Sequence, residues 1–134
     1  YNAGLDTVAT KDKAARKKYL LKADSTFKSM SVKFPDHYLG YLSSARTNSA
    51  LDPETTEGLA KPYYEKALEV MLPSQNERKA EILECYRYLG YYYYVKNELV
   101  QSKTFWNKVL EIDPTDAVSL QVIKSIDSSL KKGK

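Results

Sequence analysis

The stretch CYRYLGYYYY, from Cys85 to Tyr94, holds six of the chain's twelve tyrosines around one Leu-Gly pair. A helix turns by about 100° per residue, so consecutive side chains point in different directions and one buried face cannot hold all six rings. Some rings must therefore lie in a core, and the others must face a second surface. How the rings divide between these two environments decides what the sequence predicts about function.

Three segments of the chain share a pattern that is centred on an aromatic residue. They read ADSTFKSM (23–30), AKPYYEKA (60–67) and SKTFWNKV (102–109), each with a small residue four positions before the aromatic and an apolar residue three positions after it. A proline follows each aromatic by eight or nine residues, and the aromatics are 37 and 42 residues apart. This spacing predicts an internal repeat of helix pairs with a period of about 34 residues and short insertions.

The opening stretch supplies the rest of the pattern. YRYLGYYY (86–93) precedes SKTFW (102–106) and Pro114, which resembles the tetratricopeptide repeat (TPR) motif W-x₂-L-G-x₂-Y…A-x₃-F…P. Tyr replaces the Trp of the motif, Ser replaces the Ala and Trp replaces the Phe. We expect Gly90 to allow a close approach of the following helix, Trp106 to pack into the stripe formed by the first, and Asn97 to tolerate a left-handed turn between them.

The middle repeat contains a second Leu-Gly pair, Leu39-Gly40, which does not fit the repeat spacing. In the last repeat, Leu89 precedes Pro114 by 25 residues, so a period of about 34 residues places the next Leu-Gly slot nine residues beyond a proline. Counting nine residues from Pro35 reaches Ser44 and Ala45, so we expect Ala45 in the glycine slot and Tyr41 in the large aromatic slot.

The resemblance implies an all-α fold, a right-handed α-α superhelix of TPR helix pairs that ends in a C-terminal capping helix. We expect one TPR domain over 1–134, with a partial first repeat with an elongated second helix (1–35), a repeat (36–73), a second repeat (74–114) and the capping helix (115–131). Residues 1–4 are interpreted as the tail of a helix that lies upstream. Asp36 and Ser74 are the expected caps of two of the helices, and the expected helix ranges are 10–33, 37–50, 59–72, 74–96, 98–112 and 116–131.

Catalytic chemistry finds little support in the residues. The only histidine, His37, is expected to be a surface or capping residue, and the only cysteine, Cys85, a small buried thiol. There is no glycine-rich phosphate loop, and Glu54 and Glu57 are interpreted as caps rather than as an acid–base pair. We therefore predict that the chain is not an enzyme and needs neither a cofactor nor a metal.

The charge pattern bears on the choice of partner. Residues 1–35 carry eight Lys or Arg against three Asp, a net +5, whereas residues 36–73 carry three basic against six acidic residues, a net −3. The basic residues of the first helix (Lys11, Lys13, Arg16, Lys17, Lys18 and Lys22) are expected to spread around it, which favours a solvated helix over a nucleic-acid site. No apolar run is long enough to insert into a membrane.

In TPR proteins the first helix of each repeat lines a concave groove, so the resemblance implies a peptide-binding or protein-binding surface. Carried over to this sequence, the expected groove residues are Leu42, Arg46, Arg87, Tyr88, Tyr91 and Tyr94. Tyr86 and Tyr93 are expected in the core, and Tyr92 is expected to pack near Tyr63 or Tyr64. The alternative, in which the additional rings only pack between helices, stays open at this point.

The leading functional hypothesis is a non-catalytic scaffold that contacts a protein or peptide through a groove bearing Tyr and Arg. The alternative is a purely structural spacer or an oligomerisation module of a larger protein, in which the chain forms a homo-oligomer. ARTNSALDPETTEGLAKPYYEKALE (45–69), together with YLGYYYY (88–94), resembles the C-terminal part of longer bacterial TPR proteins. These are commonly exported, so the resemblance implies an extracytoplasmic, periplasmic location.

Overall fold

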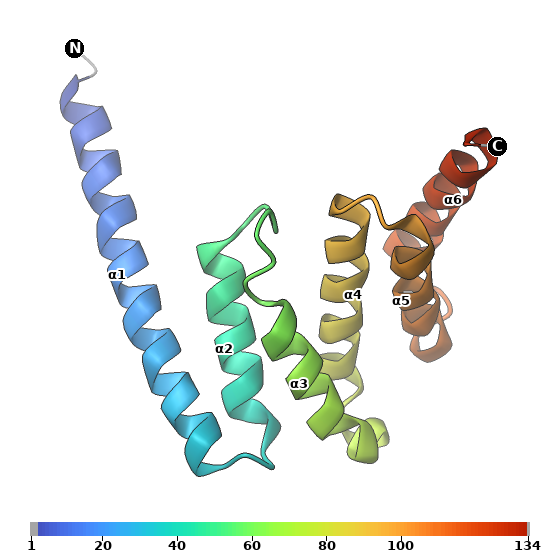
Figure 1. Cartoon of the computed structure of the whole chain (residues 1–134), viewed down its shortest axis with the longest axis horizontal. Helices are drawn as coiled ribbons and strands as arrows, with labels where there is room; N and C mark the ends of the chain where they lie inside the picture. Colours follow the sequence, from blue (N-terminus) through green and yellow to red (C-terminus); the bar gives the residue numbers. More distant parts are fainter. Residues whose placement is uncertain (1–2, 134) are drawn as a thin grey trace. The chain divides into compact units, whose positions relative to one another are not determined.

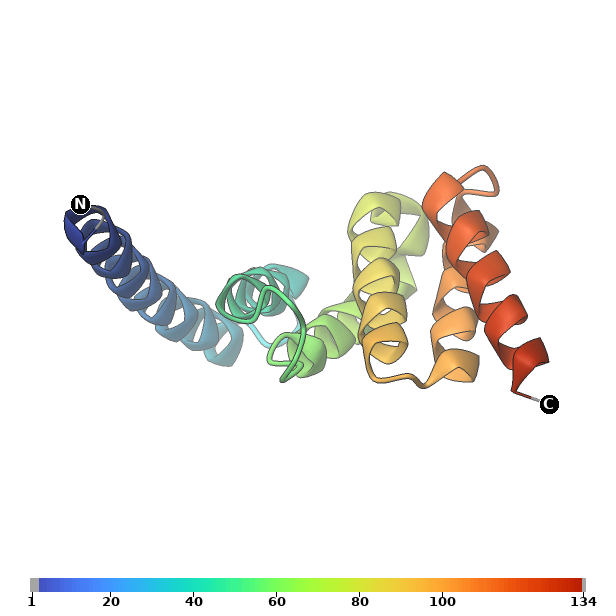
Figure 2. The same cartoon turned by 90° about the horizontal axis from the view of Figure 1, so that it is seen from above.

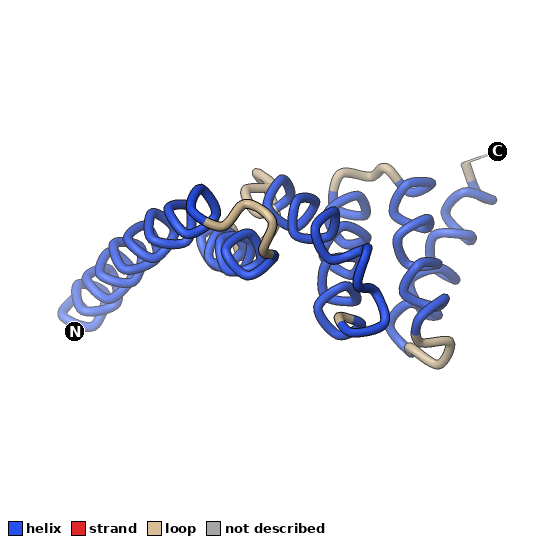
Figure 3. The backbone as a smooth tube through the Cα atoms, turned by 90° about the horizontal axis from the view of Figure 1, so that it is seen from below, coloured by secondary structure: helices blue, strands red, loops and turns tan. Residues whose placement is uncertain are grey.

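The computed structural model describes the backbone of residues 3–133 and the side chains from Asp12 to Gly133. Figures 1 and 3 show that this part of the chain is built from helices and loops, without a strand. The elements are α1 (Ala3–Lys33), α2 (Tyr38–Leu51), α3 (Lys61–Met71), the short 3₁₀-helix η1 (Leu72–Glu77), α4 (Lys79–Val95), α5 (Leu99–Ile112) and α6 (Ala117–Lys132). The predicted all-α class is confirmed.

The chain forms two compact units, Tyr1–Tyr63 and Tyr64–Lys134, with the boundary inside α3. The first unit holds α1, α2 and the loop that follows α2, and the second holds most of α3 together with α4, α5 and α6.

In the first unit, α1 is one continuous helix of 31 residues that packs along α2. The expected helix tail at residues 1–4 is wrong for residues 3 and 4, which belong to α1, and residues 1 and 2 lie outside the described part. Gly40 allows the close approach of α2, because a Cβ there would lie 2.6 Å from Ser31 Oγ. Gly40 therefore lies against the preceding helix, whereas a glycine in the Leu-Gly slot of the repeat is expected to lie against the following helix.

A buried polar contact also joins α1 to α2. Asn48 Nδ2 donates to Asp24 Oδ1 at 2.8 Å, and both side chains are buried. Hydrogen bonding to a partner removes most of the cost of burying such groups, so this pair fixes the relative register of the two helices.

The cap of α2 is His37 rather than Asp36. The Nδ1 atom of His37 accepts a hydrogen bond from the Leu39 backbone N–H at 3.2 Å. The prediction that Asp36 caps this helix is therefore wrong by one residue, and the interpretation of His37 as a capping residue is confirmed.

The loop after α2 is organised by one buried carboxylate. Asp52 Oδ2 accepts a hydrogen bond from the Gly58 N–H at 2.7 Å and longer ones from the N–H groups of Glu57 and Leu59. Thr55 and Gly58 have positive φ angles of 58° and 70°, which turn the chain back toward α3. Several N–H groups on one carboxylate hold the loop in a defined conformation.

In the second unit, the helix that was expected to begin at Ser74 begins later. Residues 72–77 form the 3₁₀-helix η1, in which Ser74 has non-helical angles (φ −114°, ψ 37°). The helix α4 begins only at Lys79, after Arg78 as an N-cap residue that makes no side-chain capping bond. Ser74 is therefore not the start of this helix, and α4 has an ordinary length of 17 residues.

The contact between α4 and α5 follows the TPR expectation. A Cβ on Gly90 would lie 2.7 Å from Trp106 Cε2, so the buried indole lies directly against the glycine backbone. Ser102 Oγ donates to the Gly90 carbonyl at 2.7 Å, and Asn97 takes the left-handed conformation (φ 60°) between the helices. The predicted roles of Gly90, Trp106 and Asn97 are confirmed.

The helix α6 packs on α5 after a short loop, and Figure 2 shows α4, α5 and α6 following one another side by side. Asp116 caps α6, since its Oδ2 accepts from the Ser119 N–H at 2.9 Å. Among the apolar residues of this helix, Ile126 is fully buried, whereas Val118 is 58% exposed and Leu130 is 37% exposed. The helix therefore packs on α5 with one side and leaves apolar side chains exposed elsewhere on its surface.

Candidate interaction surface

The groove residues expected on α2 have different environments. Leu42 is only 1% exposed, so its side chain belongs to the core and its assignment to an accessible groove is wrong. Arg46, one helical turn further on, is exposed. The small residues Ser44 and Ala45, which we expect in the Leu-Gly slot of this repeat, are both fully buried.

Arg87 of α4 is held by a contact inside the second unit. One guanidinium nitrogen donates to Asp116 Oδ1 at 2.8 Å, and the carboxylate also accepts the backbone and hydroxyl hydrogen bonds of Ser119. The Ser119 bonds, assisted by Arg87, lower the pKa of the Asp116 carboxyl below its ordinary value, although burial opposes them. Arg87 thus links α4 to the start of α6 through Asp116.

Tyr88 lies against α3. Its ring stacks on that of Tyr64 with the ring centroids 4.5 Å apart, and the Tyr64 hydroxyl donates to Glu84 Oε2 at 2.9 Å. We expected Tyr92 near Tyr63 or Tyr64, but the ring that stacks on Tyr64 is that of Tyr88. For Tyr88 the packing alternative therefore describes the contact better than the groove assignment.

The rings on the opposite side of α4 pack on α5. Tyr86 is buried, and Tyr93 stacks on Phe105 with the two planes 4° apart and the centroids separated by 5.6 Å. Tyr92 lies edge-on to Tyr93. Burial, with Glu111 and Cys85 nearby, raises the pKa of the Tyr86 hydroxyl. The expectation that Tyr86 is a core residue is confirmed.

Tyr91 and Tyr94 remain accessible. They are 45% and 43% exposed, and Val95 beside them is 40% exposed. Residues three and four positions apart are neighbours on a helix surface, so these side chains form one continuous patch at the end of α4. This group of three residues is called the α4 patch below.

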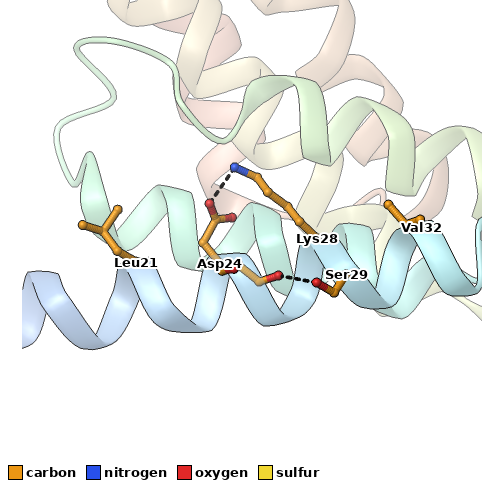
Figure 4. A pocket seen from close by; sticks show the side chains of 6 residues that line it. Leu21, Asp24, Lys28, Ser29 and Val32 are labelled. Atoms are coloured by element: carbon orange, nitrogen blue, oxygen red, sulfur yellow. Dashed lines mark hydrogen bonds and ion pairs between the residues drawn. The ribbon is translucent and has the colours of Figure 1, made fainter.

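A hollow lies on α1 in the first unit. Figure 4 shows the Lys28 ammonium bonded to Asp24, between the apolar side chains of Leu21 and Val32. Asp24 also accepts from Asn48, and Lys28 lies over the Tyr63 ring at 5.3 Å. Because the charged groups of this hollow already have partners within the unit, it offers little to a charged ligand.

Catalytic and metal-binding residues do not cluster in the described part of the chain. His37 caps α2, and Cys85 is a buried free thiol, as expected. Within residues 12–133 no group of three or more His, Cys, Asp or Glu side chains is arranged to hold a metal. None of the described helices combines the length and the apolar character needed to cross a bilayer.

Paired helices joined by a left-handed Asn, with a glycine against a buried aromatic, define an α-helical repeat of the TPR type. The structure is similar to the C-terminal part of a TPR repeat-containing protein from Cytophaga hutchinsonii, with 40% sequence identity and a TM-score of 0.75. The match covers 79% of this chain and 41% of the other, so the chain spans less than half of that structure. The predicted resemblance to the TPR family and to the C-terminal part of a longer bacterial TPR protein is confirmed.

The other two comparisons gave no match: no protein-family model and no curated protein matches the chain. The solved structure therefore supports the helical repeat architecture, and what the chain binds has to be argued from its own residues.

The sequence analysis missed three polar residues that organise the fold. Asp52 holds the loop after α2, Asp24 pairs with α2, and Asp116 joins Arg87 to α6. Asp116 had a usable signal, because Asp-x-x-Ser before an apolar helix is typical of an N-cap. Asp24 and Asp52 had none, since their partners are set by the tertiary fold.

Proposed function

We propose that this chain is a non-catalytic scaffold that binds a protein or peptide through the α4 patch. The observation that carries the proposal is the exposure of Tyr91 and Tyr94, while Tyr86 on the same helix is buried. Exposed tyrosines supply large, rigid contact areas that lose little conformational entropy on binding, and they are common among the residues that dominate interface energetics.

The surroundings of the patch support a preformed binding surface. The helix that carries it is fixed on one side by the stacked Tyr88 and Tyr64 rings and on another by the Arg87–Asp116 ion pair. A surface held in its bound conformation loses less entropy when a partner docks. We therefore place the proposed binding surface at Tyr91 and Tyr94, with Val95 added.

The direct test is a selection of peptides that bind the 134-residue protein from a displayed library, followed by affinity measurements on variants. We expect Y91A/Y94A to weaken the selected peptides by about tenfold or more, since interface hot-spot truncations cost above about 1 kcal/mol each. Both residues are accessible, so the free energy of unfolding should change by less than about 0.5 kcal/mol per substitution.

Tyr19→Ala is the matched control, because Tyr19 is 73% exposed but lies on α1. It should leave the affinity unchanged. Peptides that bind Y91A/Y94A as tightly as the parent protein would refute the proposal.

Analytical ultracentrifugation, which measures the oligomeric state, distinguishes the spacer or oligomerisation alternative from the scaffold proposal. If the parent protein forms a dimer that Y91A/Y94A abolishes, the α4 patch is a self-association surface. A monomeric parent protein that binds peptides through the patch supports the scaffold.

A further inference from the structure

Three basic residues of α1 converge on one hollow in the first unit. Lys13, Arg16 and Lys17 lie three and four positions apart, which places them on one face of the helix. They line a hollow of about 310 Å³ together with Leu20 of α1 and with Leu51 and Pro53 at the end of α2. The basic residues Lys18 and Lys22 are outside this hollow, so only part of the basic set of this helix converges here.

Among the described side chains, none of these three cations takes part in an ion pair or a hydrogen bond. Lys28, on the same helix, is bonded to Asp24 at 2.6 Å. The basic hollow thus presents three exposed positive charges beside an aliphatic floor, and none of the three is bonded to another described side chain.

Negative groups near the basic hollow repel an anionic ligand and so limit where its negative charges can bind. An adjoining hollow shares Lys17 and Leu51 with the first one and contains Asp52 and Glu57. Asp52 is already bonded to backbone N–H groups of its own loop. The C-terminal end of α2, at Leu51, adds a partial negative charge of about half a unit, which three full positive charges outweigh.

We propose that the basic hollow binds an acidic peptide segment of a partner protein that also carries an aliphatic side chain. Carboxylates would pair with Lys13 and Arg16, and the aliphatic side chain would lie on Leu20, Leu51 and Pro53. Charge complementarity identifies the partner as acidic. The aliphatic lining favours a peptide over a nucleic acid, because single-stranded nucleic acids are bound mainly by stacking on aromatic rings, and the described residues that line the hollow include no aromatic one.

This inference concerns a surface other than the α4 patch, so the two proposals can fail separately. The probe is a fluorescein-labelled peptide in which Glu-Glu-Leu is repeated four times, titrated against the full chain by fluorescence anisotropy. A peptide with Ser in place of Leu and one with Lys in place of Glu serve as probes for the two parts of the hollow. We expect saturable binding of the first peptide, at least threefold weaker binding of the Ser peptide and no binding of the Lys peptide.

The site variant is K13Q/R16Q/K17Q, and the matched control is K18Q/K22Q/K33Q, which removes the same charge from exposed positions of α1 outside the hollow. We expect the site variant to weaken binding by about tenfold and the control by less than about twofold, because exposed ion pairs are worth up to about a factor of five each. Helicity and thermal unfolding of both variants should match the parent protein. Arg16→Gln alone provides a smaller perturbation if the triple variant is unstable.

Equal weakening in both variants would overturn the proposal, because it would show only a general effect of net charge. The proposal also fails if the first peptide does not bind. A labelled single-stranded oligonucleotide that binds more tightly than the peptide, and that the site variant loses, would assign the hollow to nucleic acid instead. A dimer that the site variant abolishes would assign it to a second copy of the chain.

Discussion

Replacing Gly90 with alanine tests the close contact on which the α4–α5 pair depends. The added Cβ would lie 2.7 Å from Trp106 Cε2 and 2.8 Å from its Nε1, whereas ordinary contacts begin at 3.4 Å. The indole would have to move by about 0.7 Å, the difference between the first and last of these distances. Trp106 is only 4% exposed, so little space is available for that movement.

The expected net effect follows from two opposing terms. Overpacking a close-packed contact costs about 1–3 kcal/mol, and the rigidity of the buried indole places Gly90→Ala in the upper half of that range. Alanine in place of glycine within a helix gives back about 1 kcal/mol. The free energy of unfolding should therefore fall by about 1–2 kcal/mol, measured by urea denaturation followed by circular dichroism at 222 nm.

A double-mutant cycle separates the clash from other effects of the substitution. In a Trp106→Phe background the smaller ring leaves space, so Gly90→Ala should cost at least about 1 kcal/mol less than in the parent protein. Gly133→Ala is the matched control, because the nearest atom to its added Cβ is a carbonyl oxygen at 3.6 Å, and it should be almost neutral. A Gly90→Ala variant as stable as the parent protein would show that the indole does not constrain the helix approach.

Three further predictions concern the second unit. Asp116 has a lowered pKa, so its contribution to stability should be complete above its ordinary pKa of 3.8 and be lost as the pH falls through the folded-state value. Asp116→Asn should therefore reduce the pH dependence of the free energy of unfolding below about pH 4. An unchanged pH dependence would contradict the role of the Ser119 and Arg87 bonds. Asn97→Gly should raise the free energy of unfolding by up to about 1 kcal/mol, because φ is 60° there, and Asn97→Ala should lower it. Urea denaturation measures both changes, and an alanine variant more stable than the glycine variant would argue against a left-handed turn. The Cys85 thiol is fully buried and should react with a thiol reagent only as fast as the unit opens, so rapid labelling under native conditions would contradict its placement.

The parts of the fold that the sequence predicted correctly depend on local patterns. Gly90 and Trp106 belong to one short motif, and Asn97 lies between them at a fixed spacing, so a single stretch of chain contains the information for their contact. The ends of α5 and α6 were predicted to within a residue or two, because an apolar helical period ends near Pro114 and begins again after Asp116.

The start of α4 shows where a local pattern misleads. Ser74 and Glu77 have the spacing of a capping box, but they follow Pro73 and precede residues 78–81, three of which are charged, so no apolar stripe begins there. The first buried apolar side chain of the helix is Ile82. Burial of an apolar face stabilises most helices, which explains why the regular helix begins near that residue and not at the capping motif.

The candidate site was predicted only in part, because its residues have distant partners. Arg87 bonds to Asp116, 29 residues later, and Tyr88 stacks on Tyr64, 24 residues earlier. Residue type and helical period place a side chain on a face, but they do not identify the neighbour that faces it. Of the predicted residues, Arg46, Tyr91 and Tyr94 are the ones that are exposed.

The single tryptophan has a practical consequence for studying how the protein unfolds. Trp106 is buried in the second unit, and the first unit contains no tryptophan, so tryptophan emission, excited selectively at wavelengths that tyrosine does not absorb, reports the environment of α4 and α5 alone. Far-ultraviolet ellipticity, in contrast, averages over every helix. Coincident transitions from the two signals would show that both units unfold in one cooperative event, and separate midpoints would give each unit its own stability without a label.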